Sequence, residues 1–274
     1  GLLLRRNSLD PFHYAPEVAI NARLAGQLDM YNNLLHRVDE IAESRYFNQQ
    51  INRTNLYAAD PDVLDDRKID NKYTPYVNQQ DGGNVWVKPQ GTFEKISPNG
   101  FSDYDNRAYS TFIGYEMPVA TMKRGWDLVN TIFGGYQGSY QSWDGGSNWQ
   151  NGGSGGYMAN LYRKNFFAGA VVAMGGSGVN SNGSAPMNRS MDYGLFDVGG
   201  AMRVGYNVGL GKHWLLQPML TTSYIYISGL NDKGNNLCER YNVDGTHTVM
   251  VAPGLKLVGN YNGWQPYLVV DYTW

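Results

Sequence analysis

The chain is poor in the residues that build most binding and catalytic sites. It has 274 residues, one cysteine and four histidines, so no internal disulfide can form and no metal-ligand spacing is present. It lacks any apolar run of the roughly eighteen residues that a membrane-spanning helix needs. A formal net charge of −2, with no basic stripe, argues against nucleic acid as a partner. We expect no metal and no cofactor.

Glycine and the large aromatic residues are abundant instead, with 34 Gly, 21 Tyr and 7 Trp. Glycine allows strands to bend and to pack closely in a curved sheet. Tyrosine and tryptophan favour the interface between a membrane and water. A soluble glycan-binding β-sandwich can share this composition, which therefore does not decide the fold class.

Strict alternation between 196 and 227 is more informative. Phe196, Val198, Met202 and Tyr206 fall on one face of an extended chain and Asp197 falls on the other. The pattern resumes from 214 to 226. Each strand has about ten residues or more, whereas strands of soluble sheets usually have five or six. About ten tilted residues cross an outer membrane in a β-barrel.

The rest of the chain after 83 shows the same pattern. We predict nine strands, at about 84–94, 107–118, 125–141, 154–163, 165–175, 192–206, 213–227, 246–258 and 263–274. The links alternate between long and short, and the long ones include 142–153 and 176–191. Outer-membrane barrels have short periplasmic turns and longer external loops, so this alternation favours a barrel over a sandwich.

The alternation also orients the charged residues. Four of them share the small or polar face of their strands: Glu116, Asp197, Arg203 and Lys256. An Arg or Lys placed against lipid at mid-depth costs about 2–4 kcal/mol. We therefore predict that these four side chains face the lumen.

The first 83 residues are organised differently. Prolines make residues 1–20 look extended, and residues 46–83 form a polar connector. Between them, residues 21–45 show helical periodicity, with this apolar stripe: Leu24, Leu28, Tyr31, Leu35, Val38 and Ala42. Charged residues on the other faces include Arg23, Arg37 and Arg45, which fit contacts with a polar lumen. A helix packed outside the barrel is the alternative.

A helix, a polar connector and a barrel of long strands, in this order, resemble the translocator domain of the autotransporters (type V secretion). The resemblance is carried by four stretches, Asn84–Gly91, Asn165–Gly169, Gly199–Tyr206 and Gly263–Leu268. It implies an all-β, transmembrane antiparallel barrel with the N-terminal helix threading its lumen. It also implies a place in the outer membrane of a Gram-negative bacterium, where the barrel anchors and helps to export an N-terminal passenger.

The resemblance implies partners and a strand count as well. The partners are outer-membrane lipid and lipopolysaccharide, the barrel-assembly machinery and the protein's own passenger, of which residues 1–20 would be the end. The family's barrel has twelve strands. We therefore expect the chain to stop about three strands early, as a fragment or matured product, or to hide a strand near 73–77 in the connector.

The pair Asn32-Asn33 is the only candidate for chemistry. With Leu34 and Arg37 it resembles the site at which some autotransporters cut their own helix, and Glu116 or Asp197 would then assist. We favour the interpretation that these are two polar residues on a solvated face of the helix. We therefore do not expect an enzyme. Two other functions stay open: a porin-like channel with a helical plug, and a soluble glycan-binding β-sandwich. Separately, the 142–153 link is a candidate glycan-binding loop at the cell surface.

Overall fold

The computed structural model describes residues 14–58, 83–97, 103–184, 189–211, 213–232, 241–261 and 264–272. One long helix, α1 (Ala15–Ala58), precedes the strands. The main sheet has eleven strands among the described residues, and nine of them form its continuous path: β1 (Asn84–Ile96), β2 (Tyr104–Glu116), β4 (Trp126–Trp143), β5 (Gly146–Arg163), β6 (Phe166–Gly183), β7 (Ser190–Tyr206), β9 (Trp214–Ile227), β12 (Thr246–Gly259) and β13 (Tyr267–Asp271). The short elements are β3 (Ala120–Met122), η4 (Lys123–Gly125), β8 (Val208–Leu210), β10 (Leu230–Asp232) and β11 (Tyr241–Val243).

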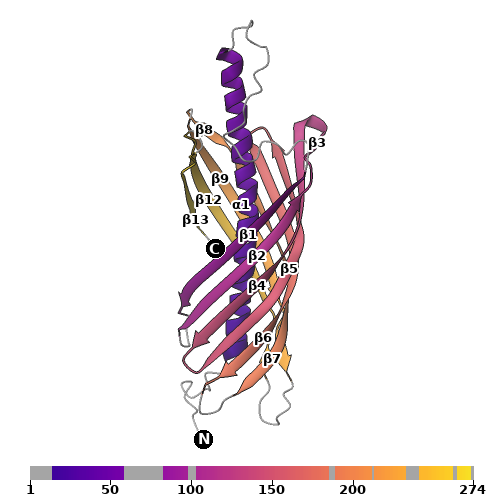
Figure 1. Ribbon diagram of the computed structural model, residues 1–274, viewed down its shortest axis with the longest axis vertical. Coiled ribbons are helices and arrows are strands. Elements are labelled where there is room, and N and C mark those ends of the chain that lie inside the picture. The colour runs from indigo at the N-terminus through magenta and orange to yellow at the C-terminus, as the bar shows by residue number, and fades with distance from the viewer. Residues whose placement is uncertain are drawn as a thin grey trace.

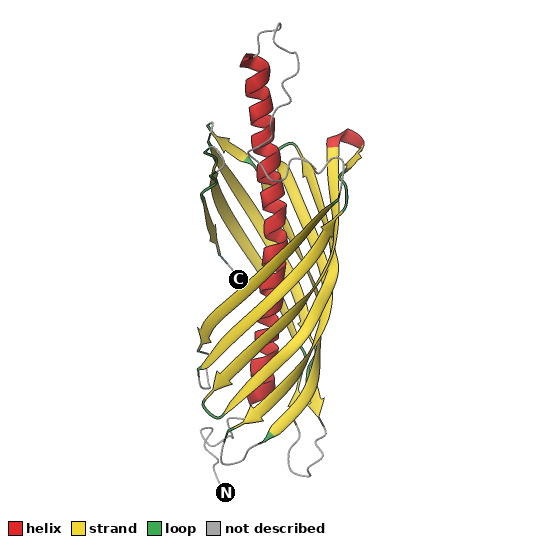
Figure 2. Cartoon of the chain, in the orientation of Figure 1, coloured by secondary structure: helices red, strands yellow, loops and turns green. Residues whose placement is uncertain are grey.

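The main sheet is a single antiparallel layer in the order β1-β2-β4-β5-β6-β7-β9-β12-β13, with β3 paired to β4 and β8 to β9. It curls around α1 as a half-barrel, with β1 and β13 at the two ends of the order (Figure 1). The strands that surround the long helix (Figure 2) confirm the predicted all-β class with a helix in the lumen, and the two-layer sandwich was wrong. Among the described residues, no helix is both long and apolar enough to cross a bilayer.

The two faces of the sheet differ as the alternation predicts. On β7, Phe196 and Met202 are 49% and 48% exposed, whereas Asp197 is 2% exposed. On β12, Val249 is 68% exposed and Lys256 only 2%. The apolar side chains therefore point away from α1, and the charged ones point towards it.

Strands β4, β5 and β6 are longer than predicted, and two of the predicted loops were wrong. The last strand, β13, is shorter than the predicted 263–274. Residues Trp143 and Gly146 pair directly across a two-residue turn, so the 142–153 link is mostly strand and the proposed glycan-binding loop is absent there. The 176–191 link is likewise shorter than predicted, because β6 continues to Gly183. Composition misled here because the inner face of a barrel is polar, so Gly, Ser and Asn continue the strands. The predicted long–short rhythm consequently fails between β4 and β5.

Glycine has a specific role in one of these extended segments. A Cβ on Gly152 would lie 2.1 Å from the carbonyl oxygen of Gly176 on the neighbouring strand. Only a residue without a side chain allows the two backbones to approach so closely.

The helix also exceeds its predicted bounds of 21–45 at both ends. Pro16 lies in the first turn, where its missing N–H has no helical partner to lose. Beyond Arg45, Tyr46 and Phe47 pack with Leu215 and Val258 in a small apolar cluster, and this tertiary contact favours further helix. The predicted extended region 1–20 and connector 46–83 are therefore helical at 15–20 and 46–58. The possible strand at 73–77 lies outside the described residues.

Candidate functional site: the interface between the helix and the barrel wall

Among the described residues, five ion pairs connect α1 to the inner face of the sheet. Two of them join Arg23 to Asp197 and Arg203 to Asp39, both at 2.6 Å. The other three are Arg37–Glu116, Arg45–Asp127 and Lys256–Glu43. All seven charged residues singled out from the sequence for this interface, four on the wall and three on the helix, take part in these pairs.

Arg23 makes four hydrogen bonds to the wall. Its Nε donates to Asp197 at 2.7 Å, and its two terminal nitrogens donate to Gln137 and Ser154, each at 2.9 Å. A fourth bond, at 3.3 Å, goes to the carbonyl oxygen of Gly153. The guanidinium therefore bridges strands β4, β5 and β7, and fixes the helix against the centre of the wall.

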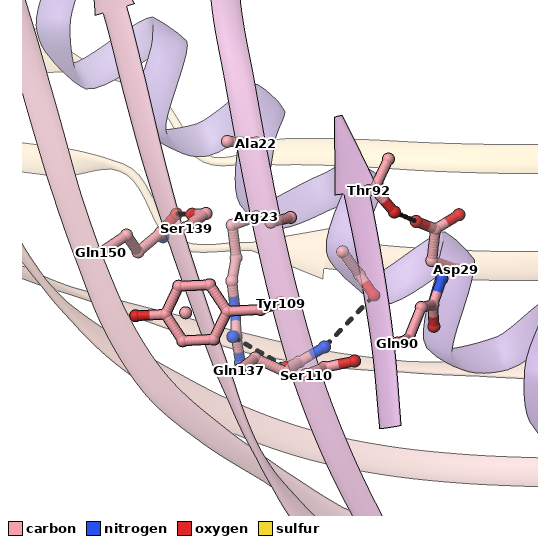
Figure 3. A pocket seen from close by; sticks show the side chains of 13 residues that line it. Ala22, Arg23, Asp29, Gln90, Thr92, Tyr109, Ser110, Gln137, Ser139 and Gln150 are labelled. Atoms are coloured by element: carbon pink, nitrogen blue, oxygen red, sulfur yellow. Dashed lines mark hydrogen bonds between the residues drawn. The ribbon is translucent and has the colours of Figure 1, made fainter. Parts of the chain in front are cut away.

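The pocket beside Arg23 shows how tightly the helix fills this side of the lumen (Figure 3). It lies between α1 and strands β1, β2, β4 and β5, and its volume is only about 30 Å³. Asp29 accepts a bond from Thr92 at 3.4 Å, and Gln137 donates to the carbonyl oxygen of Gly26 at 3.2 Å. The helix therefore leaves little space against this part of the wall.

The pairs grip the helix from opposite sides. An α-helix turns about 100° per residue, so side chains two positions apart point about 200° apart. Arg37 pairs with Glu116 on β2, whereas Asp39 pairs with Arg203 on β7. The same spacing recurs six residues later, where Glu43 meets β12 and Arg45 meets β4.

Pairs of both polarities occur along the helix. Arg23, Arg37 and Arg45 meet wall carboxylates, whereas Asp39 and Glu43 meet wall cations. A rotation or a shift of the helix would bring like charges together and would leave buried charges without partners, which is strongly unfavourable. The pattern therefore specifies one register of the helix in the lumen.

Wall glycines complete the fit. A Cβ on Gly169 would lie 2.5 Å from Cγ2 of Val38, and one on Gly209 would lie 1.9 Å from the hydroxyl of Tyr46. Gly199 similarly faces the Tyr31 hydroxyl. At these three positions, a helix side chain occupies the space that a wall side chain would otherwise fill.

Asn32 lies on the side of α1 opposite Arg23, because nine residues at about 100° each place the two side chains about 180° apart. Asn32 is exposed to a cavity of about 240 Å³, which Asp39 and Asp271 also line. The carbonyl oxygen of Asn33 accepts a bond from Lys88 at 3.0 Å, and its amide donates to Gln90. The structure does not bring the predicted assisting acids to this pair.

Those two acids are engaged elsewhere. Glu116 binds Arg37 and accepts a further bond from Asn84 at 3.3 Å, and Asp197 binds Arg23. Within the described ranges, neither carboxylate contacts Asn32.

Sequence reasoning missed the wall residue Asp127 and did not identify Asp39 and Glu43 as partners of the wall cations. Asp127 shares its parity with Val129 and with other inward side chains of β4, so the alternation contained the signal. Asp39 and Glu43 carried no such signal, because helical periodicity does not reveal which strand a side chain faces. Across the described part of the chain, no group of three His, Cys, Asp or Glu could hold a metal ion.

Comparison with known families matches the described sheet almost completely. The sequence profile of the autotransporter beta-domain matches residues 85–274. The chain belongs to this family. Autotransporter beta-domains are outer-membrane β-barrels of Gram-negative bacteria, and this one is an outer-membrane translocator for the export of an attached passenger domain. Such translocator domains are generally not enzymes.

Solved structures support the same fold for this autotransporter beta-domain. It is similar to the beta domain of the Bordetella autotransporter BrkA, with a TM-score of 0.63 and 19% identity, over 70% of this chain and 78% of that one. It is also similar to the transport unit of AIDA-I from Escherichia coli, with a TM-score of 0.57 and 14% identity, over 80% of this chain and 75% of that one. No protein of curated function matches it in sequence.

Proposed function

We propose that α1 is the tether and plug of this translocator, seated in the lumen after the passenger has passed and held there by the five ion pairs. The single observation that carries the proposal is their distribution: β2, β4, β7 and β12 each contribute a charged partner, from opposite sides of the helix. A helix packed outside a barrel would have no such ring of partners. A surface-exposed passenger would thereby stay connected to the membrane through α1.

Planar-bilayer conductance distinguishes a plugged translocator from an open channel. We expect the purified protein to show brief, small openings, because α1 runs through the lumen and the five ion pairs hold it against the wall. The double variant Arg37→Ala, Arg45→Ala removes two of the ion pairs that hold the helix. Long openings should therefore become about tenfold more frequent or more. The matched control replaces two exposed basic residues, Lys95 and Arg107, and should behave as the parent does. Steady, large conductance in the parent would instead favour the porin-like channel.

The outward face supports a place in the outer membrane. We propose that its apolar band contacts the acyl chains, that lipopolysaccharide surrounds the end where α1 begins, and that the barrel-assembly machinery inserts the sheet. Exposed apolar side chains such as Val172 and Met174, at 60% and 62%, would be unfavourable in water over so large a surface. Slower gel migration after heating in detergent, together with recovery in the outer-membrane fraction, tests this placement.

We further propose that the peptide bond between Asn32 and Asn33 stays intact. The support is that Glu116 and Asp197 are each bound to an arginine. We expect the intact mass of the purified, folded protein to show no break after Asn32. A fragment that begins at Asn33 would contradict this, and its loss on replacing Asn32 with alanine would then establish self-cleavage.

A further inference from the structure

The rim of the barrel at the C-terminal end of α1 carries a patch that the translocator function does not use. Two neighbouring turns, 123–125 between β3 and β4 and 164–165 between β5 and β6, bring four basic and two aromatic residues together. We call this set the basic rim cluster: Lys123, Arg124, Arg163, Lys164, Trp126 and Phe166.

The sheet register places the members of the cluster side by side. Arg163 pairs with Phe166 across β5 and β6, and the neighbouring pair Asp127–Tyr162 joins β4 to β5. Trp126 therefore starts β4 beside Arg163. The Arg163 guanidinium carbon lies 5.4 Å from the centre of the Trp126 ring, and that ring meets Phe166 edge-on at 5.8 Å.

The cluster faces away from the lumen. Tyr162 is buried and donates to the carbonyl oxygen of Val38 on α1, so Arg163, the next residue along the strand, points outward. Asp127 points inward and pairs with Arg45. Its carboxylate therefore does not neutralise the cluster, and among the described residues no carboxylate forms an ion pair with any of its four cations.

The backbone conformation at two of these residues supports a role for their side chains. Arg124 and Lys164 have φ angles of 67° and 52°, in the left-handed region that glycine and asparagine adopt at lower cost. Each turn thus carries a long basic side chain at a position where a smaller residue would relieve strain. Strain of this kind is retained where a side chain has a use.

The opposite rim carries basic residues too, Lys95 and Arg107 among them, but it is richer in carboxylates. Five exposed aspartates occupy the strand ends and turns there: Asp103, Asp105, Asp144, Asp192 and Asp244. The two rims would therefore meet different headgroups. Aromatic residues at the level of the headgroups, flanked by unpaired cations, suit the phosphate of a lipid whose chains continue along the apolar face.

We propose that the basic rim cluster binds the headgroup of an anionic phospholipid in the periplasmic leaflet. This rests on the proposed placement, in which α1 begins outside and its C-terminal end emerges on the periplasmic side. Arg163, held over Trp126, and Lys164 would donate to the phosphate oxygens, and Lys123 and Arg124 would approach from the next turn. The ring of Phe166 would lie against the first carbons of the acyl chains.

Native mass spectrometry of the purified protein in detergent tests the site, with phosphatidylglycerol and phosphatidylcholine as probes. We expect tighter binding of phosphatidylglycerol. The double variant Arg163→Gln, Lys164→Asn should weaken that binding about 25-fold, since each cation near an anionic lipid surface contributes about fivefold. Asparagine preserves the left-handed backbone conformation at 164. The matched control, Lys95→Gln with Arg107→Gln, removes two exposed charges from the opposite rim and should leave the affinity unchanged.

Equal affinity for the two lipids would overturn the inference, as would an equal loss in the control variant or complete competition by inorganic phosphate at the concentration of the lipid. Heating-dependent gel mobility is measured on every variant. If it is lost in the parent, the membrane placement itself fails. If it is kept while lipid selectivity is absent, only the lipid site fails.

Discussion

Replacing Arg23 with alanine is expected to destabilise the protein by about 3–5 kcal/mol, the cost of removing one partner from a buried ion pair. Arg23 and Asp197 are 3% and 2% exposed, so the remaining carboxylate would stay buried with its main donors gone. Gln137 and Ser154 would each lose a charged donor as well. The free energy of unfolding, from urea titration followed by tryptophan fluorescence, measures the effect.

The double variant Arg23→Ala, Asp197→Ala provides the internal test. Removing both partners leaves no buried charge, so we expect the loss to be smaller than the sum of the two single losses. Lys95→Ala is the control, because the Lys95–Asp103 pair is exposed and should contribute less than about 1 kcal/mol. Additive losses in the double variant would mean that the two side chains do not interact as the structure has them.

Replacing Gly169 with leucine is expected to displace the helix from the wall. The new side chain would overlap Val38, and a Cβ at 169 would also lie 2.8 Å from Oδ1 of Asn160. Overpacking of this kind costs about 1–3 kcal/mol, and about 1.4 kcal/mol corresponds to a tenfold change in a population. Cleavage by trypsin after Arg37 and Arg45 should therefore accelerate about tenfold or more, because a displaced helix exposes both sites.

Two further variants locate the cause of this effect. Val38→Ala makes room on the helix, so it should restore part of the protection when combined with Gly169→Leu. Gly178→Leu introduces the same residue on the same strand, but its Cβ would have nothing within 4 Å. It should leave trypsin sensitivity unchanged, and an equal acceleration there would show that leucine disturbs β6 without acting through the helix.

The pattern of inward and outward side chains could be predicted well because it is local. A strand alternates with a period of two whatever surrounds it, so Asp197 and Arg203 had to share a face opposite Phe196 and Met202. The link between β4 and β5 could not be predicted in the same way. A stretch of Gly, Ser, Asn and Trp is typical of a surface loop in most proteins, and only a polar lumen makes it suitable for a strand.

The predicted ends of the helix were wrong for a related reason. Periodicity indicated where an apolar stripe begins and ends, but Tyr46 and Phe47 extend α1 because Leu215 and Val258 lie beside them. Those contacts join residues far apart in the chain, and no local pattern contains them. The predicted role for Glu116 and Asp197 beside Asn32 had the same weakness, since both carboxylates were free to meet any cation in the lumen.

By itself, the sequence determined that this protein is a sheet of long strands with apolar side chains outward and charges inward, together with one helix of mixed polarity. These features follow from periods of two and 3.6 residues, which neighbouring residues specify. Only the tertiary structure decided that Arg23 pairs with Asp197 and that Asp39 and Glu43 pair with the wall cations. The same holds for Val38, which fills the space beside Gly169. Pairings across a lumen depend on how far the helix is inserted and how it is rotated, and that register exists only once the sheet has curled around it.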